Sequence, residues 1–106
     1  LAAEAGQLEV VKDLAARNAN LEAKDRDGRT PMALAAEAGQ LEVVKDLAAR
    51  NAHLEAKDED GRTPIALAAR EGQWEVVKDL AARNANLEAK DRDGRTPMAL
   101  AAEAGQ

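Results

Sequence analysis

Residues 27–45 read DGRTPMALAAEAGQLEVVK, and this stretch decides the fold because it recurs along the chain. The chain aligns on itself with a period of 33 residues and no gaps, which gives three copies and the start of a fourth: 1–33, 34–66, 67–99 and 100–106. A fixed period of this length is typical of stacked supersecondary units, each of which buries its apolar face against its neighbours. We therefore expect all 106 residues to form a single repeat array.

The copies are almost identical. The positions that differ from the first copy are the following pairs: Asn20/His53, Arg26/Glu59, Met32/Ile65, Glu4/Arg70, Ala5/Glu71 and Leu8/Trp74. Consensus design and recent duplication both produce such copies, and design is the interpretation that we favour.

Each copy carries the signals of two short helices. In the second copy, Thr63 and Pro64 are typical of a helix N-cap and of the first helical position. Gly72 is expected to end this first helix, because glycine accepts a left-handed conformation. A second helix is predicted from about residue 74 to 83, and Asn84 ends it because asparagine tolerates the same conformation.

Large apolar residues at helical spacing predict the core. We expect these residues to be among the most buried, because their repeats have neighbours on both sides: Leu34, Val44, Leu47, Leu67, Val77 and Leu80. The sequence DEDG at residues 58–61 predicts a turn, since Asp closes Asx-turns and Gly accepts a positive φ. Asp79 and Arg83 are spaced as an i,i+4 ion pair on the second helix.

Residues 27–45 resemble the ankyrin repeat, whose signature is T-P-L-H-x-A on a period of 33 residues. The resemblance extends over the whole chain. It implies an all-α solenoid of helix–turn–helix units joined by β-hairpin turns, and a non-catalytic scaffold that binds protein. Alanine replaces the signature histidine at Ala33, Ala66 and Ala99, and Asn18, Asn51 and Asn84 stand where the family has a glycine after the second helix.

The resemblance also implies where a protein partner binds, namely the hairpin tips and first helices that form the concave face. The candidate residues at those positions, with Trp74 from the start of a second helix, are Arg26, Asp27, Arg29, Glu37, Ala38, Glu59, Asp60, Arg62, Arg70, Glu71, Trp74, Arg92 and Arg95. We expect Arg70 and Glu71 to be exposed on a first helix, beside Glu59 on a hairpin tip. The variation at these three positions indicates either specificity or the tolerance of an exposed surface. Trp74 is either a binding hot spot or a framework position that serves as a fluorescence probe.

The residue types present argue against catalysis, metal binding and a cofactor. Serine and cysteine are absent, and the carboxylates recur in register, so each repeat places them in a similar environment. His53 is the only histidine and occupies a loop position, whereas a zinc site needs three or four clustered ligands. Residues 25–28 resemble the start of a calcium loop, but Ala23 and Leu34 fall where oxygen ligands are required. We expect no enzyme activity.

Nucleic acid and membranes are also excluded as expected partners. The net charge is −5 and the chain has a single aromatic residue, whereas nucleic-acid binding calls for a basic stripe or aromatic stacking platforms. No stretch is long and apolar enough to cross a membrane, and no signal-peptide pattern opens the sequence. A natural protein of this kind is expected in the cytoplasm. The identity of the protein partner does not follow from the sequence.

The two ends suggest an alternative function. The sequence starts inside a first helix and stops after a first helix, so the polar capping repeats that normally flank a solenoid are missing. Leu1, Leu8, Leu14, Met98 and Leu100 are therefore expected to be frayed or covered by another molecule. Residues 1–7 and 100–106 are identical and cannot fill one slot of a continuous stack. The alternative is an uncapped structural module that self-associates weakly head to tail, or a part of a longer array.

Overall fold

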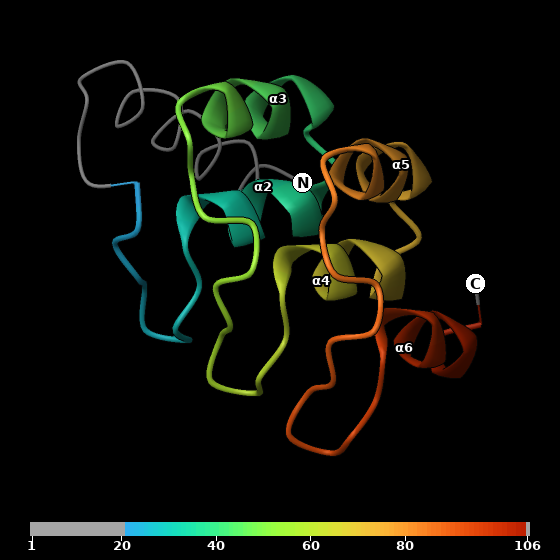
Figure 1. The fold of residues 1–106 in the computed structure, drawn as a ribbon. Helices are drawn as coiled ribbons and strands as arrows, with labels where there is room; N and C mark the ends of the chain where they lie inside the picture. The colour runs from blue at the N-terminus through green and yellow to red at the C-terminus, as the bar shows by residue number, and fades with distance from the viewer. Residues whose placement is uncertain (1–20, 106) are drawn as a thin grey trace.

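The structure is a computed structural model that describes residues 21–105. This part of the chain contains five α-helices: α2 (Pro31–Ala38), α3 (Leu41–Ala49), α4 (Pro64–Arg70), α5 (Trp74–Ala82) and α6 (Pro97–Glu103). Figure 1 shows them in two layers, with the first helices α2, α4 and α6 in one row and the second helices α3 and α5 in the other. The all-α repeat fold predicted from the sequence is confirmed.

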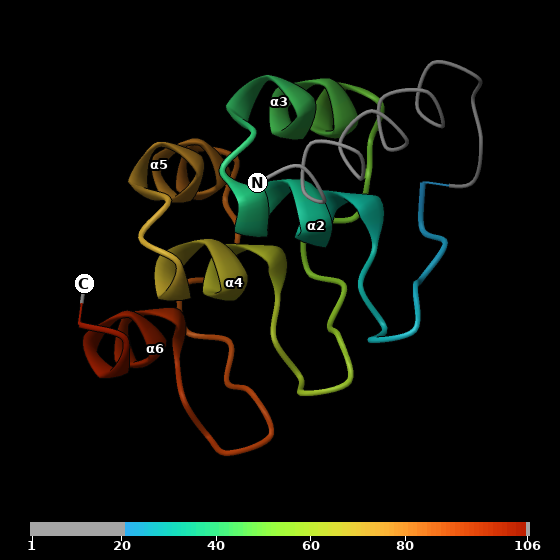
Figure 2. The ribbon, with the colours of Figure 1, turned by 180° about the vertical axis from the view of Figure 1, so that it is seen from behind.

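Three loops project from the row of first helices, on the side away from the second helices, as Figures 1 and 2 show. We call them finger 1 (residues 21–29), finger 2 (54–62) and finger 3 (87–95). No strand is formed within residues 21–105, so the expected β-hairpins are tight turns without strands. In finger 2 the turn is closed by main-chain hydrogen bonds of 3.0 Å from Asp58 N to the Arg62 oxygen and from Gly61 N to the Asp58 oxygen.

The first helices α2, α4 and α6 begin where the threonine and proline residues predict. Each N-cap threonine accepts a hydrogen bond at its side-chain oxygen from a main-chain nitrogen three residues later, as Thr63 does from Ala66 at 3.3 Å. Proline follows each cap, where its missing N–H leaves no intrahelical bond unmade. The helix starts are therefore fixed locally, independently of the packing between repeats.

The helix ends also agree with the sequence. Gly39 and Gly72 have φ values of 75° and 71°, in the left-handed region that glycine favours. Asn51 and Asn84 adopt φ values of 65° and 67° after the second helices. These are the only non-glycine residues with positive φ in the described part of the chain. The second helix predicted at 74–83 ends one residue earlier, at Ala82.

The core lies between the two layers and between successive first helices. α4 packs against both α2 and α6, while α3 packs against α2 and α5. Val44, Leu47, Leu67 and Leu80 are fully buried, as the spacing predicts. Buried alanines, including Ala35, Ala36 and Ala68, let the first helices approach one another closely.

Two of the predicted core residues are not fully buried. Leu34 and Val77 are half-buried, whereas their repeat equivalents Leu67 and Val44 are completely buried. The difference follows from position in the stack. Leu67 lies on α4, which has a first helix on either side, and Val44 lies on α3, which is followed by α5. Among the described helices, α2 lacks the neighbour that precedes it and α5 the neighbour that follows it.

The apolar residues that were expected to be frayed or covered at the two ends have three different outcomes. Leu1, Leu8 and Leu14 lie outside the described residues. Leu100 is only 2% exposed within the chain, where α6 packs against α4, so the expectation that it would be frayed or covered by another molecule was wrong. Met98 is 58% exposed and is the most exposed large apolar residue of the described chain, as the sequence suggested.

Candidate protein-binding surface

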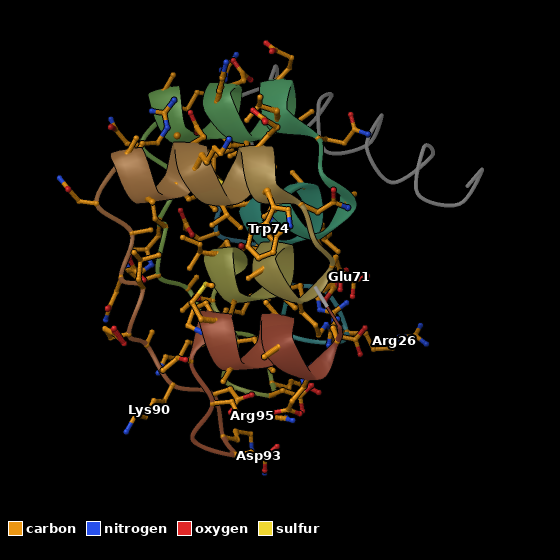
Figure 3. The ribbon with its side chains drawn as sticks, turned by 90° about the vertical axis from the view of Figure 1, so that its right-hand side faces the viewer. Arg26, Glu71, Trp74, Lys90, Asp93 and Arg95 are labelled. Atoms are coloured by element: carbon orange, nitrogen blue, oxygen red, sulfur yellow. The ribbon has the colours of Figure 1, made fainter. Side chains whose placement is uncertain are left out.

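The candidate residues divide into an exposed group and a half-buried group. Those exposed are Arg26, Asp27, Glu59, Asp60, Glu71, Trp74 and Arg92. Those half-buried are Arg29, Glu37, Ala38, Arg62, Arg70 and Arg95. Figure 3 shows side chains from both groups, with Arg26, Glu71 and Arg95 labelled. The fingers and the C-terminal ends of the first helices therefore contribute to one charged surface.

A buried aspartate organises each of fingers 2 and 3. The Oδ1 atom of Asp58 accepts hydrogen bonds of 2.9 Å from the main-chain nitrogens of Asp60 and Arg62. Its Oδ2 atom lies 3.5 Å from Nε of Arg29, which belongs to the preceding repeat. The Asp58 side chain is 1% exposed, so its charge is compensated by these donors and not by water. This aspartate thus closes its own finger and links it to the repeat before.

Asp91 closes finger 3 in the same way, because its Oδ1 atom accepts hydrogen bonds of 2.9 Å from the main-chain nitrogens of Asp93 and Arg95. Burial raises the pKa of Asp91, but the main-chain N–H groups of Arg95 and Asp93 and the Arg95 guanidinium more than offset that effect. The net result is a pKa below the ordinary value. Arg95 lies 3.3 Å from Asp91, and its own pKa is raised, first by its hydrogen bond to Glu103. The charged forms of both groups are therefore favoured in the folded protein.

An arginine at each finger base faces the end of the first helix in its own repeat. Arg29 pairs with Glu37 at 3.1 Å, and Arg95 pairs with Glu103 at 2.6 Å. In the repeat between them, the equivalent of the glutamate is Arg70. Two arginines thus occupy positions that form an ion pair in the repeats on either side.

The side chain of Arg62 is left without hydrogen bonds as a result. Its Nη1 atom lies 3.7 Å from Asp60 Oδ2, and its Nε atom lies 3.8 Å from Asp91 Oδ2, both beyond hydrogen-bonding distance. The Nε atom is buried and has no hydrogen-bond partner, and no other side-chain nitrogen or oxygen of residues 21–105 shares that condition. Sequence reasoning gave no indication of this, although the change from glutamate to Arg70 was visible.

Arg70 turns towards the preceding repeat. It forms ion pairs with Glu37 at 3.0 Å and with Glu71 at 3.1 Å. Glu37 therefore pairs with both Arg29 and Arg70. Arg70 was expected to be exposed, but its side chain is only 25% exposed because these two carboxylates hold it against the surface. Glu71 is exposed, as expected, and follows α4 directly.

Trp74 does not join the fingers. It begins α5, in the second layer, and Figure 3 shows it apart from Asp93 at the tip of finger 3. Its side chain is 38% exposed beside a shallow groove of about 280 Å³. The groove is lined by Gly39, Gly72, Gln73, Trp74, Glu75 and Val76. Trp74 therefore belongs to a different surface from the charged finger residues.

The fingers are held together by contacts that the sequence analysis did not identify. The Nζ atom of Lys24 donates a 3.1 Å hydrogen bond to the Lys57 oxygen, and Lys57 reaches the Lys90 oxygen at 3.5 Å. Arg92 donates from Nη1 to the Glu59 oxygen at 3.3 Å. Each of these bonds joins residues 33 apart. The recurrence of lysine at positions 24, 57 and 90 is the feature of the sequence that could have indicated these contacts.

The remaining predictions concern the second helices and the search for metal ligands. Asp79 and Arg83 form the expected i,i+4 ion pair at 2.9 Å, and Asp46 and Arg50 form its equivalent at 3.1 Å. His53 is exposed in the loop after α3, where the sequence placed it. Within residues 21–105 there is no cluster of three potential metal ligands, and no helix is long and apolar enough to cross a membrane.

Comparison with known proteins agrees with this architecture. A family model described as ankyrin repeats (3 copies) matches residues 1–91 and 51–106, which together span the chain. No curated protein matches the sequence. Ankyrin repeats generally mediate contacts between proteins, and the family is typically non-enzymatic. The paired helices, the projecting fingers and the family match lead to one conclusion: this chain belongs to the ankyrin repeat family.

Proposed function

We propose that the chain is a non-catalytic protein-binding scaffold that recognises its partner with the fingers and the first-helix ends. The observation that carries the proposal is the tying of successive fingers by main-chain and side-chain bonds between repeats. These bonds give the exposed tips a fixed spacing before a partner arrives. A surface ordered in advance loses less conformational entropy on binding than a set of independent loops.

The chemistry of this surface defines what it would bind. Its exposed residues are mainly charged, including Arg26, Asp60, Glu71 and Arg92, and they carry both signs. Large apolar anchors are not among them in the described fingers, apart from Leu87, which is 43% exposed. Such a surface favours polar, complementary partners and modest affinity that falls as the salt concentration rises. The near identity of the copies supports consensus design as the origin of the chain.

A selection from a random peptide library displayed on phage tests the proposal. The full chain is immobilised, and enriched clones are rebound to two double-substitution variants. Arg26→Glu/Arg92→Glu changes fingers 1 and 3, whereas Lys45→Glu/Lys78→Glu makes the same change in charge on α3 and α5. We expect the finger variant to lose binding and the helix variant to keep it. Failure to enrich any clone, or loss only in the helix variant, would overturn the proposal.

Weak self-association is a second candidate function, and Met98 favours it. Met98 is 58% exposed, whereas Met32 and Ile65, at the same position of earlier repeats, are fully buried. In those repeats the next first helix covers the residue, so a first helix of a second copy is the occupant that fits α6. Sedimentation at increasing concentration should then show rising mass, which Met98→Lys abolishes. A constant monomer mass would eliminate this function.

A further inference from the structure

We propose that Arg62 binds an acidic side chain, aspartate or glutamate, of the partner protein. This inference rests on the function proposed above and specifies one contact within it. The starting point is the position that Arg62 shares with Arg29 and Arg95. Each of these arginines stands at the base of a finger, and each is followed eight residues later by a charged side chain in the last turn of the first helix of its repeat.

The neighbouring repeats show what this kind of site holds. Arg29 donates from Nη1 to Glu37, and Arg95 donates from Nη1 to Glu103. In both cases a carboxylate meets the Nη1 edge of the guanidinium. Arg70 replaces that glutamate in the central repeat and turns away to Glu37 and Glu71. Of the three equivalent arginines, Arg62 is therefore the one that has no carboxylate at this position of its own first helix.

The remaining acidic groups do not take its place. Asp60 and Asp91 approach Arg62 only to 3.7 and 3.8 Å. Asp91 already accepts from the main-chain nitrogens of Asp93 and Arg95 and from the Arg95 side chain. The Arg62 side chain is 15% exposed, and its Nε atom is buried without a hydrogen-bond partner. A mostly buried charged donor that has no hydrogen-bond acceptor gains from an incoming carboxylate.

The chemistry favours a carboxylate over other anions. A guanidinium presents its donors in a planar fork that matches a planar carboxylate. The neighbouring sites each accommodate one glutamate side chain, and the nearby Asp60 and Asp91 oppose a group with a larger negative charge. The acidic residue would enter between finger 2 and the end of α4. A peptide lying across the first-helix ends could deliver it there.

Nuclear magnetic resonance of the full chain tests the assignment, with the Nε–Hε signal of Arg62 as the reporter. Hexaglutamate peptide is titrated into the protein, and hexalysine and inorganic phosphate serve as comparison probes. We expect hexaglutamate to shift the Arg62 signal in a saturable manner, while hexalysine does not. Absence of a shift with hexaglutamate, or an equal shift with phosphate at the same concentration, would overturn the carboxylate assignment.

Two charge-reversal variants separate the site from general electrostatics. Arg70→Glu restores the glutamate found in the neighbouring repeats and should weaken hexaglutamate binding roughly tenfold or more, because Arg62 then has an internal partner. Arg83→Glu makes the same change in net charge on the C-terminal end of α5 and should change the affinity by about twofold or less. Equal weakening by both variants would contradict a specific site.

The phage selection distinguishes this inference from the function on which it rests. If enriched clones depend on the fingers and contain an acidic residue whose replacement abolishes binding, the Arg70→Glu variant should lose those same clones. Clones that need the fingers but are indifferent to Arg70→Glu would overturn the role of Arg62 and leave the binding function intact. Clones that do not need the fingers would overturn both.

Discussion

The main-chain nitrogen of Arg92 donates a hydrogen bond of 2.9 Å to the carbonyl oxygen of Asp60, which ties the tip of finger 3 to the tip of finger 2. Glu59 makes the equivalent bond to Asp27 at 3.1 Å, so the same link joins fingers 2 and 1. The close approach of the two backbones is possible because a glycine lies at the contact. A Cβ atom built on Gly61 would lie 2.9 Å from Arg92 N.

Gly61→Ala should therefore destabilise the chain more than the same change in finger 3. Gly61 and Gly94 have φ values of 77° and 79°, so alanine incurs about 1 kcal/mol of left-handed strain at either position. At Gly94 the added Cβ meets no atom within 4 Å, whereas at Gly61 it displaces the Arg92 backbone. Urea unfolding followed by circular dichroism measures both variants. Equal losses would show that the fingers are not in contact in solution.

Two leucines, one buried and one exposed, allow a matched test of the core. Leu47 on α3 is fully buried, and Leu87 on finger 3 is 43% exposed. Leu47→Ala should lower the free energy of unfolding by about 2–5 kcal/mol, since it removes packed methyl groups and leaves a cavity. Leu87→Ala should cost less than about 1 kcal/mol, because much of that side chain is already in water. A near-zero effect of Leu47→Ala would mean that the core is assigned to the wrong face.

The sequence predicted these helix boundaries well because residues at the boundaries determine them through local interactions. Thr63, Gly72 and Asn84 carry their signals through their own conformational preferences, and all three behave as expected. Burial was less predictable, because it depends on neighbours in the stack. Leu34 and Leu67 occupy the same repeat position, yet only Leu67 has a described first helix on each side.

The candidate site shows the same division between local and long-range information. Placing Glu71 on an exposed helix end required only the repeat register. The half-burial of Arg70 depends on Glu37 of the preceding repeat, and the unpaired Nε of Arg62 depends on its 3.8 Å distance from Asp91 of the following repeat. One substitution at position 70 changes the pairing of arginines in two repeats, and such an effect is visible only when the repeats are stacked.

The threonine caps provide a test of local stability. Thr63 is 1% exposed, and its Oγ1 accepts a hydrogen bond from Ala66 N at the start of α4. Thr63→Ala removes this acceptor and should cost about 1–2 kcal/mol, the upper part of the usual range for N-caps, because the donor is also buried. Thr63→Ser keeps the oxygen and should retain most of the stability. Equal losses in thermal unfolding experiments would attribute the effect to the lost methyl group instead.

Acid should destabilise the chain in part through Asp91. Its pKa in the folded protein lies below the ordinary aspartate value of about 3.9, so the unfolded chain binds protons more readily as the pH falls towards that value. The stabilisation is therefore present above about pH 4 and is lost as the pH falls through the folded-state pKa. Asp91→Asn removes the ion pair with Arg95 and should cost about 1.5 kcal/mol at pH 7. It should also make the decline in unfolding free energy below about pH 4 less steep than in the parent chain.

Glu75→Gln is the control, because that carboxylate is 77% exposed and lies 3.8 Å from Lys78. Urea unfolding from pH 2 to 7 measures all three proteins, and an unchanged slope in Asp91→Asn would show that other carboxyl groups determine the acid transition.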